Sequence, residues 1–293
     1  DCHAGEALES LDEVLRSRQP SWIQHATRTA AKDYFADTKD EELSSPKDYG
    51  KRAQAMVAQG YTALKFDLDV PGTQGSDAYN RCLTNPAIDR MVALVGEVRD
   101  AVGYDVDVSV DCHWRYSVSD VVKVAQALEP FRLLWLEDPV PPDSIEALRA
   151  VSSRVKIPIA TGENLYLFAG FREILQTHAV GIATPDLQKV GGLAVASQIA
   201  QFADAQTIPV APHNISSPVG TLASAHFCAA IPNFLVLEFH AADVPFWNDL
   251  VEGVPKPIIQ NGSIQLPDKH GLGVRLNEDV ARKYARKGEP FFE

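Results

Sequence analysis

The chain has few of the residues that mark disulfide-bonded, zinc-binding or nucleic-acid-binding proteins. Its 293 residues contain four scattered cysteines, Cys2, Cys82, Cys112 and Cys228, without CxxC spacing. This pattern indicates neither a zinc knuckle nor a disulfide framework, so we interpret the cysteines as reduced thiols. Basic residues are also scarce, because 27 Lys and Arg stand against 39 Asp and Glu and give a net charge of -12. That balance argues against a nucleic-acid partner, for which a basic stripe is typical.

Long apolar runs are missing as well. No run approaches the roughly 18 apolar residues that a membrane span needs, and the amino-terminal segment lacks the order of a signal peptide. We therefore expect no membrane partner and a cytoplasmic location. Hydrophobic residues make up 45% of the chain, which is ample for one large barrel or two medium domains.

What the chain does have, from about residue 44 on, is a regular alternation of strand-like and helix-like segments. The first predicted helix begins after Ser45 with Pro46 at its first position and ends at Gly60. Helical periodicity also predicts helices at 86–102, 117–130, 145–155, 171–180, 193–206 and 218–231. Short apolar runs predict strands at 62–67, 106–111, 133–137, 157–161, 181–186, 208–212 and 234–239.

Seven βα repeats predict an α/β fold, a TIM-like (β/α)7β or (β/α)8 barrel. An eighth strand is a weak candidate at 29–37. We divide the chain into an N-terminal segment, 1–43, a catalytic barrel, 44–253, and a C-terminal segment, 254–293, that packs on the barrel or on a cap. The long irregular loop at 67–85 is typical of a lid or specificity loop.

Polar residues, most of them acidic, end six of the predicted strands. The gaps between them are 26, 26, 23, 27 and 25 residues, about the length of one βα unit. If the strands are parallel and closed into a barrel, all six residues meet at the rim where such barrels keep their active sites. The six are Asp111, Glu137, Glu163, Asp186, His213 and Glu238.

The first three of these residues predict a metal site. Asp111, Glu137 and Glu163 end consecutive predicted strands, and three adjacent carboxylates would repel one another unless a cation lay among them. Oxygen ligands favour a hard divalent ion, of which Mg²⁺ keeps positions open for water and substrate. Any one of the three alone is better interpreted as a solvated loop residue. Their matched spacing favours the metal.

Two histidines are candidates for proton transfer. His213 follows Asp186 at the next strand end, and an imidazole oriented by a carboxylate suits a general base near neutral pH. His113 lies two residues after Asp111, on the same side of an extended segment, where it could protonate a leaving group. The alternative for His113 is a hydrogen-bond donor that supports the metal ligands.

Three further charged residues are predicted at the same rim. Glu238 could act as a hydrogen-bonding electrophile if its pKa were raised, or as a salt-bridge partner. Lys65 could screen a substrate carboxylate, and Asp67 lies on its face of the strand.

Seven motifs together resemble the enolase superfamily, within its mandelate racemase subgroup. In chain order they are ALKFD, VDCHW, LWLEDPV, ATGEN, PDLQKVGG, APHN and LEF, and the resemblance runs from about residue 44 to 277. It implies that Asp111, Glu137 and Glu163 bind an essential Mg²⁺ and that His213 and Asp186 form a base dyad. It also implies removal of the proton α to a carboxylate, which gives an enediolate.

Local differences within the resemblance favour one fate for that intermediate. Racemases of the subgroup carry a KxK motif whose second lysine is a base, and here the motif is Lys65-Phe66-Asp67. The Asp111-x-His113 arrangement resembles gluconate- and galactonate-type dehydratases, in which the histidine assists departure of the 3-hydroxyl. The implied enzyme is a sugar-acid hydro-lyase of carbohydrate catabolism that forms a 2-keto-3-deoxy acid. The family's α+β capping domain is expected to be largely absent, since too little chain precedes residue 44.

A polyhydroxylated acid requires a polar and aromatic pocket. Trp114 and Tyr116 fit this description, and the residues predicted to bind the substrate are Asp67, Arg115, Asn164, Tyr166, Asn214, His240 and Trp247. We expect a small sugar acid as the partner and a homo-oligomer as the assembly. The alternatives are a cycloisomerase or epimerase of the same superfamily, and a non-catalytic barrel that binds a sugar acid. A phosphate-handling aldolase lacks support, because no Gly-rich phosphate loop follows the last strands.

Overall fold

The computed structural model describes residues 45–70, 73, 82–241, 244–285 and 291. The predicted N-terminal segment with its candidate strand, and most of the loop at 67–85, lie outside these residues. The described chain forms two compact units. The first contains the residues up to Thr161 together with Gln176–Ile182, and the second contains Gly162–Leu175 and the residues from Ala183 on.

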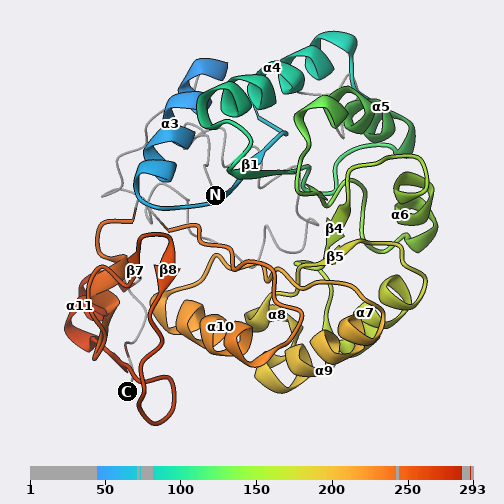
Figure 1. The fold of residues 1–293 in the computed structure, drawn as a ribbon. Coiled ribbons are helices and arrows are strands. Elements are labelled where there is room, and N and C mark those ends of the chain that lie inside the picture. Colours follow the sequence, from blue (N-terminus) through green and yellow to red (C-terminus); the bar gives the residue numbers. More distant parts are fainter. Residues whose placement is uncertain (1–44, 71–72, 74–81, 242–243, 286–290, 292–293) are drawn as a thin grey trace. The chain divides into compact units, whose positions relative to one another are not determined.

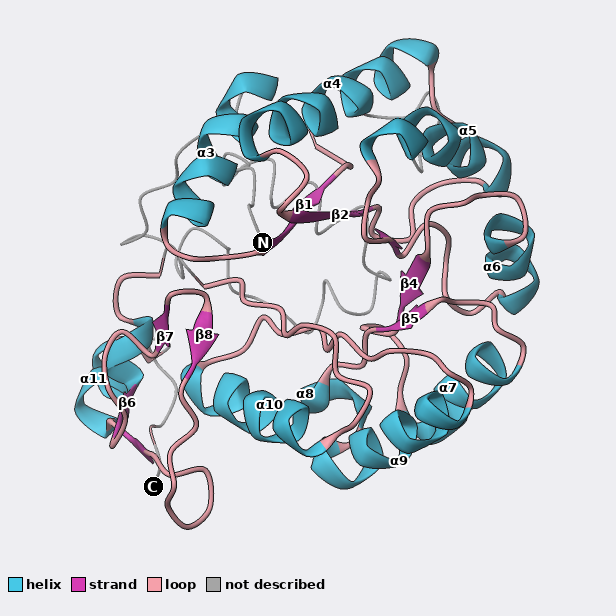
Figure 2. Cartoon of the chain, viewed as in Figure 1, coloured by secondary structure: helices cyan, strands magenta, loops and turns pink. Residues whose placement is uncertain are grey.

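The first unit is built on parallel strands: β1 (Ala63–Asp67), β2 (Asp107–Asp111), β3 (Leu136–Glu137) and β4 (Ile159–Thr161). The sheet continues to β5 (Ile182–Ala183), where the Gly181 amide donates to the Ile159 carbonyl at 2.8 Å. Asp67 pairs with Asp111, and Asp111 pairs with Glu137. This register brings the carboxyl ends of β1, β2 and β3 to one level. Figure 2 shows β1 and β2 as neighbouring arrows.

The helices of the first unit follow one another along the outside of these strands (Figure 1): α3 (Pro46–Ala58), α4 (Asn85–Val102), α5 (Val118–Leu128), the 3-10 helix η2 (Glu129–Phe131) and α6 (Ile145–Ser152). Hydroxyl side chains cap α4 and α5, since Thr84 accepts from the Ala87 amide and Ser117 accepts from the Asp120 amide. Fully buried Phe66, Leu94 and Val108 belong to the core. The elements therefore match the predicted alternation closely.

The second unit contains all but the last residue of α7 (Leu167–Gln176). It also contains α8 (Leu187–Val190), α9 (Gly192–Ala205), α10 (Pro218–Ala230) and the 3-10 helix η3 (Trp247–Leu250). Its C-terminal part forms two antiparallel pairs, β6 (Val251–Glu252) with β9 (Arg275–Leu276) and β7 (Ile259–Gln260) with β8 (Ser263–Ile264), before α11 (Glu278–Lys283). A buried apolar cluster joins this part to α10, and its members are Leu222, Trp247, Val251 and Ile258. The described residues of the C-terminal segment, 254–293, thus contribute short antiparallel strands and one short helix to the second unit.

Two predicted strands of the second unit shorten to single parallel bridges. Val210 bridges Ala183 on one side and Phe234 on the other. The ladder is confined to this point because Pro209 and Pro212 have no amide hydrogen to donate. The segments at 208–212 and 234–239 thus keep the parallel order that was predicted but hold only a few of its hydrogen bonds.

The predicted helix at 171–180 also differs from α7. The helix begins four residues earlier, at Leu167, and ends at Gln176. His178, with a positive φ of 51°, lies beyond its end in a conformation that an α-helix excludes. In the described part of the chain, no helix is long and apolar enough to cross a membrane.

Candidate active site

In the first unit, Lys65 lies between two buried carboxylates. Its Nζ is 3.0 Å from Glu137 Oε2 and 3.5 Å from Asp111 Oδ2. The two carboxylate side chains are at most 2% exposed. Strand register produces this contact, because Asp111 and Glu137 are paired residues of β2 and β3. Two buried negative charges against one ammonium leave a local excess of negative charge.

Glu137 is further oriented by Trp135, the residue just before β3. The Trp135 indole N–H donates to Glu137 Oε2 at 2.8 Å, and this oxygen also receives the Lys65 ammonium. Both donors therefore act on one oxygen of the carboxylate. Such contacts fix the orientation of a carboxylate that serves as a metal ligand.

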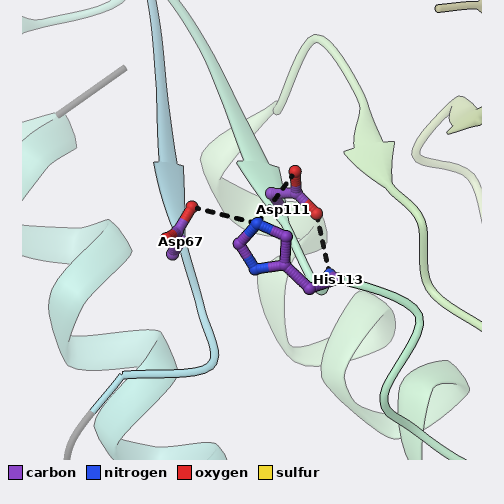
Figure 3. A group of neighbouring side chains, drawn as sticks. All are labelled: Asp67, Asp111 and His113. Carbon is purple, nitrogen blue, oxygen red and sulfur yellow. Dashed lines mark hydrogen bonds and ion pairs between the residues drawn. The ribbon is translucent and has the colours of Figure 1, made fainter. Parts of the chain in front are cut away.

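His113 lies beside Asp111 on the turn that follows β2 (Figure 3). Its backbone amide donates to Asp111 Oδ1 at 2.8 Å, and its Nε2 is 3.6 Å from Asp111 Oδ2 and 3.8 Å from Asp67 Oδ1. His113 and Trp114 both have positive φ values, 46° and 52°, which non-glycine residues seldom adopt. The turn holds the imidazole against the two carboxylates.

The surroundings of His113 favour its charged form. Burial opposes protonation, but the carboxylates of Asp111, Asp67 and Asp69 outweigh it and raise the pKa of His113 well above its ordinary value. Asp67, Asp111 and His113 each offer one ligand atom, and these atoms lie within 4.8 Å of one another. The end of β2 is therefore strongly negative and attracts cations.

In the second unit, His213 is held by Asp186. The Nδ1 atom of His213 is 2.7 Å from Asp186 Oδ2, and both side chains are at most 5% exposed. Asp186 Oδ1 accepts from the Gln188 and Lys189 amides at the start of α8, so the carboxylate is fixed by that short helix as well. Asp186 therefore fixes the orientation of the His213 ring through Nδ1 and leaves Nε2 for other contacts.

The Nε2 atom of His213 faces two glutamates. It is 3.0 Å from Glu163 Oε2 and 3.9 Å from Glu238 Oε2. Burial opposes protonation, yet Glu238, Asp186 and Glu163 together raise the pKa of His213 to about 10. Glu238 is in turn held by Asn214, whose backbone amide donates to Glu238 Oε2 at 3.0 Å.

The donor set suits a hard cation. Asp111 and Glu137 in the first unit, and Glu163 in the second, are buried carboxylates at or just after the carboxyl ends of β2, β3 and β4. Carboxylate oxygens are the ligands that Mg²⁺ prefers, and the Lys65 ammonium shows that the site in the first unit draws positive charge toward its oxygens.

The residues predicted to bind the substrate have varied surroundings. Asn164 donates to Glu163 Oε1 at 2.9 Å, Tyr166 is 60% exposed, His240 is half-buried, and Arg115 Nε is 2.8 Å from Asp69 Oδ2. The Asn214 side-chain amide donates to Thr221 and to the Glu238 carbonyl. Trp247 belongs to a buried apolar cluster, and its indole N–H donates to the Ser216 carbonyl. The last two side chains use polar atoms inside the protein, so their contact with a substrate stays a prediction.

Sequence reasoning missed three residues of the site. Asp69 binds His113, Trp135 binds Glu137, and Asp138 accepts hydrogen bonds from Thr161 through its side chain and from the Trp114 amide through its carbonyl. Asp69 is two residues beyond Asp67, and this spacing in an extended segment was the signal that could have found it. Nothing in the sequence pattern singles out the other two.

Comparison with known proteins identifies the family. Residues 48–280 match the family described as Enolase C-terminal domain-like. The chain is 43% identical over 260 residues to a D-xylonate dehydratase of Haloferax volcanii, covering 88% of this chain and 63% of that protein. It is 32% identical over 290 residues to a D-gluconate dehydratase of Thermoproteus tenax, covering 99% of this chain and 54% of that protein.

A solved structure shows the same similarity. The mandelate racemase/muconate lactonizing enzyme-like protein from Rubrobacter xylanophilus matches with a TM-score of 0.82 and 43% identity, over 86% of this chain and 64% of that one. The chain thus spans less than two thirds of the length of these relatives. The resemblance and the fold class expected from the sequence are confirmed: this chain belongs to the Enolase C-terminal domain-like family of the enolase superfamily, with its TIM-like barrel fold.

Proposed function

We propose that the protein is a Mg²⁺-dependent dehydratase of an aldonic acid, a hydro-lyase that forms a 2-keto-3-deoxy sugar acid. The observation that carries the proposal is the His213–Asp186 pair, with Nδ1 bound to the carboxylate at 2.7 Å and Nε2 directed toward Glu163 at 3.0 Å. Membership of the family and the names of the two relatives, D-xylonate dehydratase and D-gluconate dehydratase, support the substrate class.

His213 is the proposed base. Because Asp186 holds Nδ1, the ring has one nitrogen left for chemistry, and a neutral Nε2 would accept the proton from C2 of the substrate. Asp186 then stabilises the imidazolium that forms. Glu238, held by Asn214 and 3.9 Å from the same nitrogen, is the proposed hydrogen-bonding partner of the developing charge.

Asp111, Glu137 and Glu163 are the residues that would hold Mg²⁺. This assignment rests on their spacing at successive strand ends, on their carboxylate chemistry and on the family. When bound, the ion would supply positive charge to the substrate carboxylate as the proton leaves. The Lys65 ammonium contacts Asp111 and Glu137. It would add a second positive charge close to the substrate carboxylate.

His113 is the proposed acid. As the C2–H bond breaks and its proton moves to His213, the C3–O bond breaks and the hydroxyl leaves with a proton from His113 as water. The enol that remains then becomes the 2-keto-3-deoxy acid, so the substrate loses one water in all. Asp67 stands at the position of the second lysine of racemases, and without that base racemisation is disfavoured.

Incubation with D-xylonate, D-gluconate and D-galactonate in the presence of Mg²⁺ tests the proposal. We expect a 2-keto-3-deoxy acid from at least one of the three, and no product when EDTA removes the metal. Failure to convert any of a broad panel of aldonic acids would contradict the proposal. Exchange of the C2 proton for solvent deuterium without loss of water would instead favour an epimerase or cycloisomerase.

A further inference from the structure

His113 and Asp69 form a histidine–aspartate pair in the first unit, comparable to the pair of His213 and Asp186 in the second. The Asp69 carboxylate has no role in the proposed mechanism. Asp69 Oδ1 is 2.8 Å from His113 Nδ1, and Asp69 Oδ2 is 2.8 Å from Arg115 Nε. The Asp69 side chain is 2% exposed. One buried carboxylate therefore contacts the imidazole and the guanidinium of two side chains of the turn after β2, one through each oxygen.

The backbone around Asp69 is fixed on both sides. The Leu68 amide donates to the Asp111 carbonyl at 2.8 Å, which extends the contact of β1 with β2 by one residue. The buried Thr73 hydroxyl lies 2.7 Å from the Leu68 carbonyl and 2.6 Å from the Val70 carbonyl. These contacts hold the carboxylate in place under the imidazole.

Two hydrogen bonds of His113, one to Asp69 and one to Asp111, fix the orientation of its ring. Asp111 Oδ1 accepts from the His113 backbone amide, and Asp69 accepts from Nδ1. Nε2 is then the ring nitrogen that faces Asp67 and Asp111, at 3.8 and 3.6 Å (Figure 3). The arrangement repeats that of His213, whose Nδ1 is also bound by an aspartate.

We propose that Asp69 is a positioning residue that holds His113 with its proton on Nδ1, so that Nε2 delivers the proton to the departing 3-hydroxyl. This inference rests on the proposed dehydratase function and adds to it a residue that does not touch the substrate. A carboxylate is required because one of its oxygens accepts from His113 while the other forms an ion pair with the Arg115 guanidinium. An amide carries no charge and offers one acceptor and one donor. In Asp69→Asn, the oxygen is expected to face the charged Arg115, and the NH₂ group then forces His113 to accept through Nδ1.

The first test is independent of activity. In ¹⁵N NMR spectra of the histidine side chains, the wild-type protein should show His113 with a hydrogen-bonded proton on Nδ1, assigned by its loss in His113→Gln. Asp69→Asn should abolish this signal and leave that of His213 in place, while Asp186→Asn should do the reverse. An unchanged Nδ1 proton on His113 in Asp69→Asn would overturn the proposal.

The second test compares two leaving groups. Asp69→Asn should lower kcat for dehydration about 100-fold with little change in KM, which is the lower end of what acid catalysis contributes. Elimination of fluoride from the 3-deoxy-3-fluoro analogue needs no proton donor and should stay within a few fold of wild type. A control, Asp120→Asn, removes a buried carboxylate at the start of α5 and should treat both substrates alike.

The outcomes separate the two proposals. Equal losses for both substrates in Asp69→Asn would mean a merely structural role and would overturn the positioning role, as would undiminished dehydration. If the wild-type protein dehydrated no aldonic acid, the proposed function would fail. The hydrogen bond between Asp69 and His113 would then be tested by the NMR signal of the His113 Nδ1 proton alone.

Discussion

The indole N–H of Trp135, the residue just before β3, donates a hydrogen bond of 2.8 Å to Oε2 of Glu137, two residues later in the chain. Loss of a contact that orients a metal ligand typically weakens metal binding 10- to 100-fold. Trp135→Phe should therefore reduce Mg²⁺ affinity about 10-fold, measured by calorimetry. Trp247→Phe is the matched control, since its indole binds the Ser216 carbonyl, and it should leave the affinity unchanged. Equal affinities in Trp135→Phe and wild type would argue against Glu137 as a ligand.

The protonation of His213 should make both stability and activity depend on pH. Its pKa of about 10 lies above the ordinary 6.5, so in the Mg²⁺-free protein its contribution to stability is fully present below pH 6.5 and is lost as the pH rises through about 10. The free energy of unfolding in urea should fall over that window, and less so in His213→Gln. A general base must be neutral to accept a proton, so kcat/KM should rise with pH as His213 loses its proton. This rise is the acidic limb of the pH profile.

The carboxylates around His213 also determine the pH at which the acidic limb of kcat/KM lies. Glu238 makes the largest charge contribution to the raised pKa of His213, so Glu238→Gln should shift the acidic limb of kcat/KM to lower pH. Glu252→Gln, a change at an exposed residue of β6, should not move it. A limb at the wild-type position in Glu238→Gln would contradict the assignment of the limb to His213.

Arg99 should be important for the stability of the first unit. Its guanidinium, buried at the end of α4, donates to the carbonyls of Gly103, Val106, Phe131 and Arg132. Truncation would leave several of these buried acceptors unsatisfied, so Arg99→Ala should lower the free energy of unfolding by about 3 kcal/mol. Arg149→Ala, at an exposed position of α6, should cost less than about 0.5 kcal/mol. Similar urea midpoints for the two variants would refute this role.

Gly162 should tolerate no side chain. Its φ is 157°, and a Cβ atom there would lie 2.7 Å from the Thr184 backbone carbon. Gly162→Ala must push the backbone apart next to Glu163 and should destabilise the protein by about 2–3 kcal/mol. Gly170→Ala is the control, because its added Cβ makes only ordinary contacts and alanine favours the helix α7. Equal stability of the two variants would show that the contact at Thr184 is not restrictive.

Much of the fold could be predicted because local signals agree with it. Ser45 and Pro46 begin α3 as expected, and Gly60, with a φ of 94°, follows its end. Apolar runs located β1 to β5. The reduction of the next two strands to bridges at Val210 was not anticipated, although Pro209 and Pro212 were visible and their missing amide hydrogens account for it.

The site was predictable only where residues recur at strand ends. Periodic spacing singled out Asp111, Glu137, Asp186 and His213, since each follows the apolar residues of its strand. Asp69 and Trp135, which orient His113 and Glu137, do not recur at this spacing. Asp69 reaches His113 across 44 positions of the sequence, through a turn whose shape depends on Thr73 and on the contact of Leu68 with Asp111. Such contacts arise from the folded backbone, which the sequence pattern does not display.

The central claim is that His213 removes the proton at C2 in a dehydration. The most direct test measures the rate at which wild type and His213→Asn form a 2-keto-3-deoxy acid from the best aldonic acid with Mg²⁺, while calorimetry follows Mg²⁺ binding. We predict a loss of rate of about 1,000-fold in His213→Asn with the Mg²⁺ affinity retained. Product formation by His213→Asn at the wild-type rate would contradict the account.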